Sequence, residues 1–202
     1  MLLWLLIFSI AMAYLESAVV VYLRMLYYPD GFTFPIVLIE TRTALIELGR
    51  EAATIVMLYG VARLTYKKAL HRFCAFMFCF GVWDICYYFW LYVFLKWPPG
   101  LLTWDILFLI PVPWLGPVIA PVIVSISMIV SAVIIIKIEE RGKVFHNNWR
   151  HWVAAVIGGV GSILSFSKNF YIIPAGLFSG EISWGFCCFG GALGVNAVDG
   201  LA

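Results

Sequence analysis

The segment ETRTALIELGREAAT (residues 40–54) places charged residues inside a part of the chain that otherwise resembles a membrane-spanning helix. At about 100° per residue, most of its polar side chains fall within an arc of roughly 100° on one helix face. These side chains are Glu40, Thr43, Glu47, Arg50, Glu51 and Thr54, with Arg42 on the far side. Lipid cannot cover a charged wall, so other helices, water or a bound ion must do so. We therefore expect apolar segments to gather around a charged interior.

The composition predicts an integral membrane protein. Of 202 residues, 64% are hydrophobic and 12% are charged, and the mean hydropathy is +1.00. A soluble domain of this length could not bury so much apolar surface. No polar run is long enough for an aqueous domain, so we expect residues 1–202 to form a single transmembrane domain. The net charge of +2 and the scattered basic residues give no indication of a nucleic-acid partner.

Apolar runs separated by turn signals predict an all-α polytopic bundle with six transmembrane helices. The expected spans are residues 1–28, 35–66, 70–97, 116–137, 150–166 and 182–198. Residues 101–110 are too few to cross and precede Pro111, so we expect an interfacial or re-entrant segment there. Basic residues concentrate around the loops after the second and fourth spans, which predicts a multi-pass topology with both termini cytoplasmic.

Charged residues near the middle of the expected spans are the candidate site. Four are acids and one is a base: Glu16, Glu47, Glu51, Asp84 and Arg50. A buried carboxylate without a partner is costly, so the surplus acids should be protonated, hydrated or bound to a cation. In the alternative interpretation, Arg50 pairs with Glu47 and Glu51 on its own helix and is held by Asp84 or Glu16 from a neighbour. Such a cluster would only determine which helices touch.

A secondary group of polar residues flanks these charges. It comprises Arg24, Glu40, Thr43, Thr54, Tyr87, Tyr88 and Asp105. Arg24 can turn toward the bundle or extend to the interface. The hydroxyl groups of Tyr87 and Tyr88 are one helical turn from Asp84 and within reach of its carboxyl group. Asp105 lies in a second Trp-Asp-Ile tripeptide, which is far too short to indicate an internal repeat.

The sequence predicts no catalytic residue, metal site or cofactor. The three histidines, His71, His146 and His151, lie in or beside loops, which disfavours haem ligation and a di-iron site in the bundle. Gly-x-Ser-x-Gly and His-Glu-x-x-His are absent. The aromatic residues cluster near the expected interfaces, and contact with lipid, quinone or pigment stays open. The cysteines lie in apolar runs, as is typical of packing residues: Cys74, Cys79, Cys86, Cys187 and Cys188.

Three functions remain open at this point. The absence of redox ligands and substrate motifs favours a non-catalytic membrane subunit or partner-binding module, whose partners are the bilayer and other membrane subunits or a second copy. The surplus of buried acids favours a small proton or cation translocator that uses Glu47, Glu51 and Asp84 as relay sites. An intramembrane enzyme is the third alternative.

Overall fold

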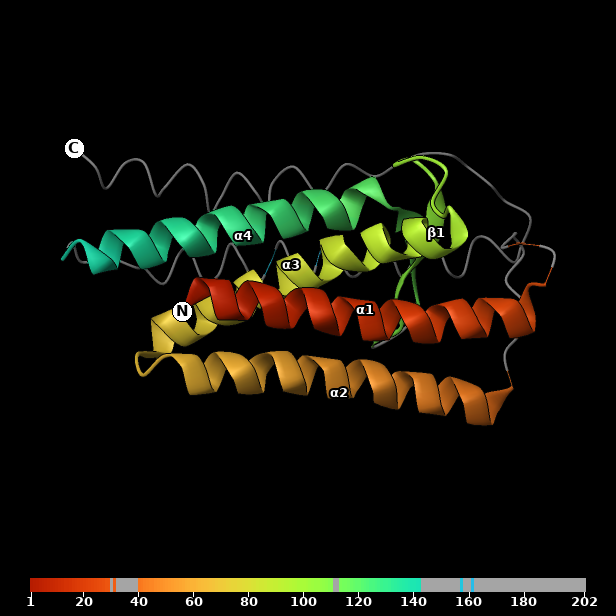
Figure 1. Ribbon diagram of the computed structural model, residues 1–202, viewed down its shortest axis with the longest axis horizontal. Helices are drawn as coiled ribbons and strands as arrows, with labels where there is room; N and C mark the ends of the chain where they lie inside the picture. Colours follow the sequence, from red (N-terminus) through yellow and green to blue (C-terminus); the bar gives the residue numbers. More distant parts are fainter. Residues whose placement is uncertain (30, 32–39, 111–112, 143–156, 158–160, 162–202) are drawn as a thin grey trace.

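The computed structural model describes residues 1–29, 31, 40–110, 113–142, 157 and 161. Within these residues the chain forms four helices and a two-stranded antiparallel sheet (Figure 1). In chain order, these are α1 (Leu2–Tyr27), α2 (Thr41–Thr65), α3 (Ala69–Leu95), β1 (Trp104–Phe108), β2 (Trp114–Pro117) and α4 (Ile119–Glu140). The helices α1, α3 and α4 are long and apolar enough to cross a membrane. The prediction of a mostly helical protein with membrane-spanning segments is confirmed at this level.

The predicted count of six spans finds no support in the described residues, which contain four helices. The expected spans 150–166 and 182–198 lie outside the described residues, apart from positions 157 and 161. The second span also differs, because the described helix begins at Thr41 with Glu40 as its N-cap. At 25 residues, α2 is as long as its neighbours, but its charges exclude it from the helices that qualify by composition.

A β-hairpin, which the all-α prediction missed, occupies part of residues 101–117. Strand β1 pairs antiparallel with β2, so that Asp105 lies opposite Gly116 and Ile106 opposite Leu115. The predicted start of a helix at residue 116 is therefore wrong, since Pro117 ends β2 and α4 begins at Ile119. Pro121 falls in the first turn of α4, where a missing backbone N–H costs little.

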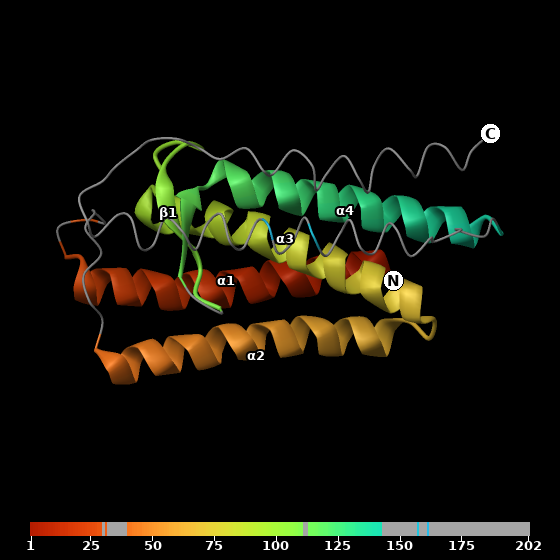
Figure 2. The same cartoon turned by 180° about the vertical axis from the view of Figure 1, so that it is seen from behind.

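The hairpin runs across the helices rather than along them (Figure 2). Non-helical backbone at membrane depth is tolerated only where protein buries it or where it lines a cavity, because lipid cannot satisfy its polar groups. Strand pairing satisfies many of these groups here. Two more bonds close the base of the hairpin, from Val118 N–H to the Thr103 carbonyl at 3.0 Å and from Ile119 N–H to the Leu101 carbonyl at 2.8 Å.

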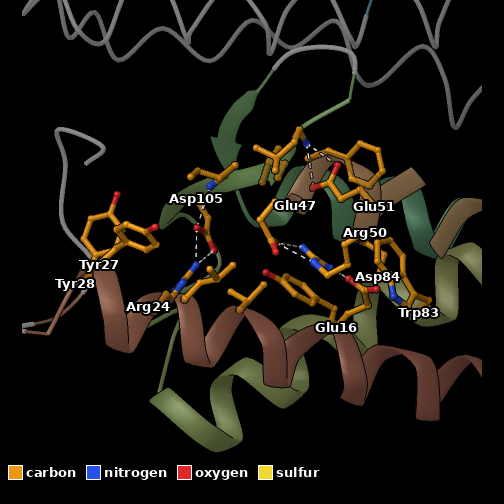
Figure 3. Close-up of a pocket in the computed structure, with 17 residues that line it drawn as sticks. Glu16, Arg24, Tyr27, Tyr28, Glu47, Arg50, Glu51, Trp83, Asp84 and Asp105 are labelled. Carbon is orange, nitrogen blue, oxygen red and sulfur yellow. Dashed lines mark hydrogen bonds and ion pairs between the residues drawn. The ribbon is translucent and has the colours of Figure 1, made fainter. Parts of the chain in front are cut away.

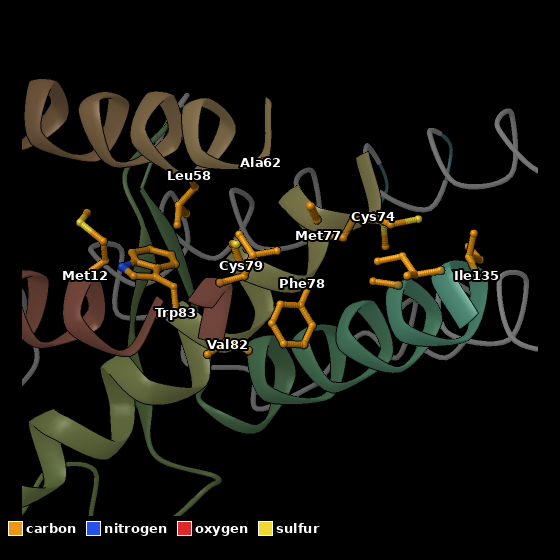
Figure 4. Close-up of a cluster of buried hydrophobic side chains, with 14 of the residues drawn as sticks. Met12, Leu58, Ala62, Cys74, Met77, Phe78, Cys79, Val82, Trp83 and Ile135 are labelled. Atoms are coloured by element: carbon orange, nitrogen blue, oxygen red, sulfur yellow. The ribbon is translucent and has the colours of Figure 1, made fainter. Parts of the chain in front are cut away.

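The helix α3 is the centre of the bundle and packs against α1, α2 and α4. Its approach to α4 is close at Gly81, where an added Cβ would lie 2.7 Å from the Ser125 carbonyl oxygen. Buried apolar side chains from the helices form the core around α3 (Figure 4). Cys74 and Cys79 are fully buried in this core and act as small packing residues.

The loop between α2 and α3 lies beside the carboxyl end of α4. Lys68 Nζ is 3.2 Å from Glu139 Oε2, and His71 Nε2 is 2.9 Å from the same oxygen. The amino terminus of α1 lies at this end of the bundle as well (Figure 1). The hairpin lies toward the opposite end, so the described part of the molecule has a loop end and a hairpin end.

Candidate functional site

A cavity of about 120 Å³ lies between α1, α2, α3 and the hairpin (Figure 3). Every residue of the predicted central group lines it: Glu16, Glu47, Arg50, Glu51 and Asp84. Arg24, Tyr87 and Asp105, from the secondary group, also lie on its wall. The wall thus carries five carboxylates and two guanidinium groups, a formal surplus of three negative charges when all are ionised.

The helix α2 supplies part of this wall because its polar residues recur at helical spacing. Glu47, Glu51 and Thr54 follow one another by four and three positions, and all three are buried. The opposite side of the helix exposes apolar side chains such as Leu45 and Val56. One helix therefore turns carboxylates inward and hydrocarbon outward, as the charged segment predicts.

Arg50 contacts two carboxylates, one on its own helix α2 and one on α1, and the second contact joins the two helices. Its Nη2 lies 2.8 Å from Glu47 Oε2 on the preceding turn, and its Nη1 forms an ion pair with Glu16 of α1. The Thr54 hydroxyl donates a further hydrogen bond to Glu16. The predicted partner Glu47 is present, and of the two neighbours considered it is Glu16, not Asp84, that holds Arg50. Three charged side chains from two helices thus form one compact cluster.

Glu51 does not pair with Arg50, which differs from the structural interpretation of the sequence. Its carboxylate accepts hydrogen bonds from the Leu109 backbone N–H at 2.9 and 3.2 Å. The hairpin therefore supplies the polar contact of Glu51, and the described residues give it no ion pair. Glu51 is only 8% exposed, so it is a buried carboxylate without a countercharge in direct contact.

Asp84 has a similar environment on α3. The Ser125 hydroxyl of α4 donates to Asp84 Oδ2 at 2.9 Å, where the sequence had indicated the tyrosines at 87 and 88. No lysine, arginine or histidine among the described residues forms an ion pair with Asp84, which is 8% exposed. A hydroxyl group donates one hydrogen bond but brings no positive charge. Asp84 is thus the second buried acid on this wall that lacks a cation.

Asp105 is fully buried but has a complete set of partners. Arg24 Nη2 lies 2.8 Å from both of its carboxylate oxygens, and Trp97 Nε1 donates to Oδ2 at 3.0 Å. The Ile106 N–H donates to Oδ1 at 2.9 Å, and the Arg24 guanidinium lies 5.2 Å from the centre of the Trp97 ring. Arg24 therefore turns inward to hold β1 against α1 instead of extending to the interface.

The remaining predicted residues lie at the rim or away from the cavity. Glu40 is exposed at the start of α2, so it does not contribute to the polar wall. Thr43 accepts a hydrogen bond from the Tyr27 hydroxyl at 3.2 Å, and Tyr27 itself lines the cavity. Tyr88 is buried without lining the cavity, and its hydroxyl has no partner among the described residues.

Sequence reasoning missed several groups that shape the site. Leu109 contributes a backbone N–H, which no sequence pattern reveals, and Ser125 is a small polar residue in the apolar run of α4. Serine in an apolar run often forms a hydrogen bond to a neighbouring helix, so the sequence could have indicated an interhelical role for Ser125. Trp83 also lines the cavity, and its indole nitrogen has no hydrogen-bond partner among the described residues.

The surplus of carboxylates on the wall favours a positively charged guest. Within the described residues no three histidine, cysteine or carboxylate side chains converge as a metal site would require. Comparisons of the chain with protein-family models, curated proteins and solved structures find no match.

Proposed function

We propose that the protein is a multi-pass membrane protein whose acidic cavity binds a cation or proton and moves it across the bilayer. The supporting observation is that Glu51 and Asp84, both buried on the wall of one cavity, form no direct ion pair with a cationic side chain among the described residues. A carboxylate in that position is stabilised by taking up a proton or a positively charged guest. The cluster of Arg50 with Glu16 and Glu47 is the fixed part of the wall.

Liposomes containing the purified protein provide the test. Glu51→Gln and Asp84→Asn should each abolish flux of protons or cations while the protein stays folded. Each amide keeps one carbonyl oxygen that can accept the hydrogen bond of Leu109 N–H or the Ser125 hydroxyl, so the negative charge is lost while this hydrogen bond is kept. Glu40→Gln is the matched control, because Glu40 is an exposed acid on the same helix. Unchanged flux in both variants would rule out these two carboxylates as the transport site, and the absence of flux in the parent protein would rule out transport.

The second candidate is a non-catalytic membrane subunit, and the contact of Arg50 with Glu16 supports it. That ion pair and the Thr54 hydrogen bond join α1 to α2 without any need for a guest. In this case Glu51→Gln and Asp84→Asn would change neither flux nor assembly. A stable complex with other subunits after purification in mild detergent would favour this candidate.

We further propose six spans with both termini cytoplasmic. Within the described residues, the N-terminus, the loop at residues 66–68 and the end of α4 share one end of the bundle. Basic side chains gather there, including Lys67, Lys68 and Lys137, as the positive-inside rule requires of a cytoplasmic face. Labelling of single cysteines at residues 67 and 143 from the two sides of the membrane tests this orientation.

A further inference from the structure

Three of the five carboxylates on the cavity wall already contact a guanidinium group. Arg50 holds two of them and Arg24 holds the third; these acids are Glu16, Glu47 and Asp105. Drawing any of them onto a guest would leave a buried guanidinium group uncompensated. Glu51 and Asp84 are therefore the wall carboxylates that can take up positive charge without breaking an ion pair among the described residues.

Both of these acids can accept more than they do at present. The Leu109 backbone N–H donates to the two oxygens of Glu51 at 2.9 and 3.2 Å. The Ser125 hydroxyl donates to Asp84 Oδ2, and no donor among the described residues reaches Asp84 Oδ1. An ionised carboxylate offers about four acceptor positions, and a protonated one still has a carbonyl oxygen that accepts. Each acid can therefore take a proton and keep its present hydrogen bond.

A metal cation needs more oxygen ligands than these two acids supply. No three histidine, cysteine or carboxylate side chains converge within the described part of the chain. A hard cation that kept about six waters instead would need roughly 180 Å³, at about 30 Å³ for each water. The cavity measures about 120 Å³. It therefore neither replaces the whole hydration shell of a metal ion nor has room for that shell.

Water itself fits this space. At about 30 Å³ for each molecule, the cavity has room for about four waters. Carboxylate and guanidinium groups on the wall provide the polar partners that buried water requires (Figure 3). Water in this position connects Glu51 on α2 with Asp84 on α3, and carboxyl groups joined in this way relay protons in membrane proteins.

We propose that the transported ion is a proton, which Glu51 and Asp84 carry in turn through water in the cavity. Uptake forms an O–H bond on a carboxylate oxygen and release returns the proton to water, so no other reactant is consumed. Charged groups from α1, α2 and the hairpin face the two acids: Glu16, Arg24, Glu47, Arg50 and Asp105. The phenols of Tyr87 and Tyr88 lie beside Asp84 on α3. This inference rests on the proposed function, because it names the ion that the same cavity moves.

The ion selectivity of the parent protein in liposomes tests the proposal. Dyes inside the liposomes report protons, Na⁺, K⁺ or Mg²⁺, each driven by its own gradient while an ionophore for another ion balances the charge. We expect protons to cross, and we expect no metal ion to cross faster than in protein-free liposomes. Mg²⁺ is the most demanding probe, because it binds through one or two carboxylates and keeps several of its waters.

The outcomes separate this inference from the proposed function. Flux of any of the three metal ions above the protein-free level would overturn the inference and leave the proposed function standing. No flux of any ion, protons included, would overturn both. Proton flux alone, lost in Glu51→Gln and Asp84→Asn and kept in Glu40→Gln, would support both.

Infrared spectroscopy of the full chain in detergent locates the protons without relying on transport. A protonated carboxyl group has a C=O stretching band that a carboxylate lacks. We expect this band near neutral pH, shifted in D₂O, and reduced in Glu51→Gln and in Asp84→Asn. Glu40→Gln should leave it unchanged, because an exposed glutamate is ionised at that pH. A band that neither cavity variant reduces would contradict the proposal, and if a variant does not fold, the ion selectivity of the parent chain still decides.

Discussion

Toward the hairpin end, the inner face of α2 presents Glu47, Glu51 and Thr54, whereas toward the loop end the same face continues with Leu58 and Ala62. Along α3 the order of polar and apolar residues is reversed. Cys74 and Cys79 come first and lie in the apolar core, and the polar residues at the cavity follow them. We call these regions the cavity half and the core half of the bundle. Both halves are built from the same continuous helices.

The difference between the halves lies in how each keeps the helices together. In the core half, many packing contacts among side chains such as Met77 and Phe78 stabilise the helix packing together, so each contact contributes little alone. In the cavity half, a few charged groups stabilise the packing, including Arg50 with Glu16 and Glu47. Removing one partner from such a buried group leaves an uncompensated charge. The cavity half should therefore tolerate less change per residue.

The largest effect should follow from removing both partners of Arg50. In the double variant Glu16→Gln, Glu47→Gln, the guanidinium group stays charged because arginine hardly loses its proton. We expect the free energy of unfolding to fall by about 3–5 kcal/mol, the usual range for breaking a buried ion pair. Arg50→Gln should cost less, because the carboxylates left behind can take up protons. The measurement is thermal unfolding of the purified variants in one detergent.

The matched control for this prediction is Glu40→Gln, which removes an exposed acid from the same helix and should leave unfolding unchanged. A double variant as stable as the parent would show that Arg50 does not hold α1 to α2. A greater loss in Arg50→Gln than in the double variant would contradict the order that proton uptake predicts.

An intermediate effect is expected at the border between the halves. An alanine Cβ at Gly81 would lie 2.7 Å from the Ser125 carbonyl oxygen and 2.9 Å from Ile129 Cγ1. The helices α3 and α4 would have to separate, and such overpacking usually costs about 1–3 kcal/mol. Because Asp84 and Ser125 bond across this contact, Gly81→Ala should also weaken cation binding in the cavity.

The control here is Gly49→Ala on α2, where an added Cβ meets nothing within 4 Å. Alanine favours a helix over glycine, so this variant should be more stable by up to about 1 kcal/mol. Thermal unfolding and cation flux in liposomes, measured for both variants, make the comparison. If both glycine variants behave alike, close approach of α3 and α4 does not matter to the site.

The charged segment at residues 40–54 was sufficient to predict where the polar interior lies. Charge in a long apolar helix is so unfavourable in lipid that Glu47, Arg50 and Glu51 had to face inward, and the structure places all three on one cavity. The mostly helical architecture followed from the lengths of the apolar runs, which are long enough for helices that cross a membrane. The spacing of Glu47 and Arg50 also indicated their ion pair, since residues three apart are neighbours on a helix.

The hairpin and its contacts could not be predicted in this way. Its strands are short and mostly apolar, and a short apolar run looks alike as a strand or a buried helix. The bond from Leu109 to Glu51 depends on a backbone N–H, and the bond from Ser125 to Asp84 on which helix faces α3. Arg24 was open to two orientations, and only the position of Asp105 in the folded hairpin decides between them.

The smallest effect is expected at the loop end, from Lys68→Gln. The Lys68 side chain is 71% exposed, and its ion pair with Glu139 spans 3.2 Å. An exposed pair gains little because water and salt screen it and two side chains lose freedom, so we expect a loss below about 1 kcal/mol. Glu139 also keeps His71 at 2.9 Å, which limits the loss further. Thermal unfolding at low salt should show a small difference in stability between Lys68→Gln and the parent protein, and high salt should remove it. A loss of stability as large as that of the Glu16→Gln, Glu47→Gln variant would show that charge holds the loop end together as well.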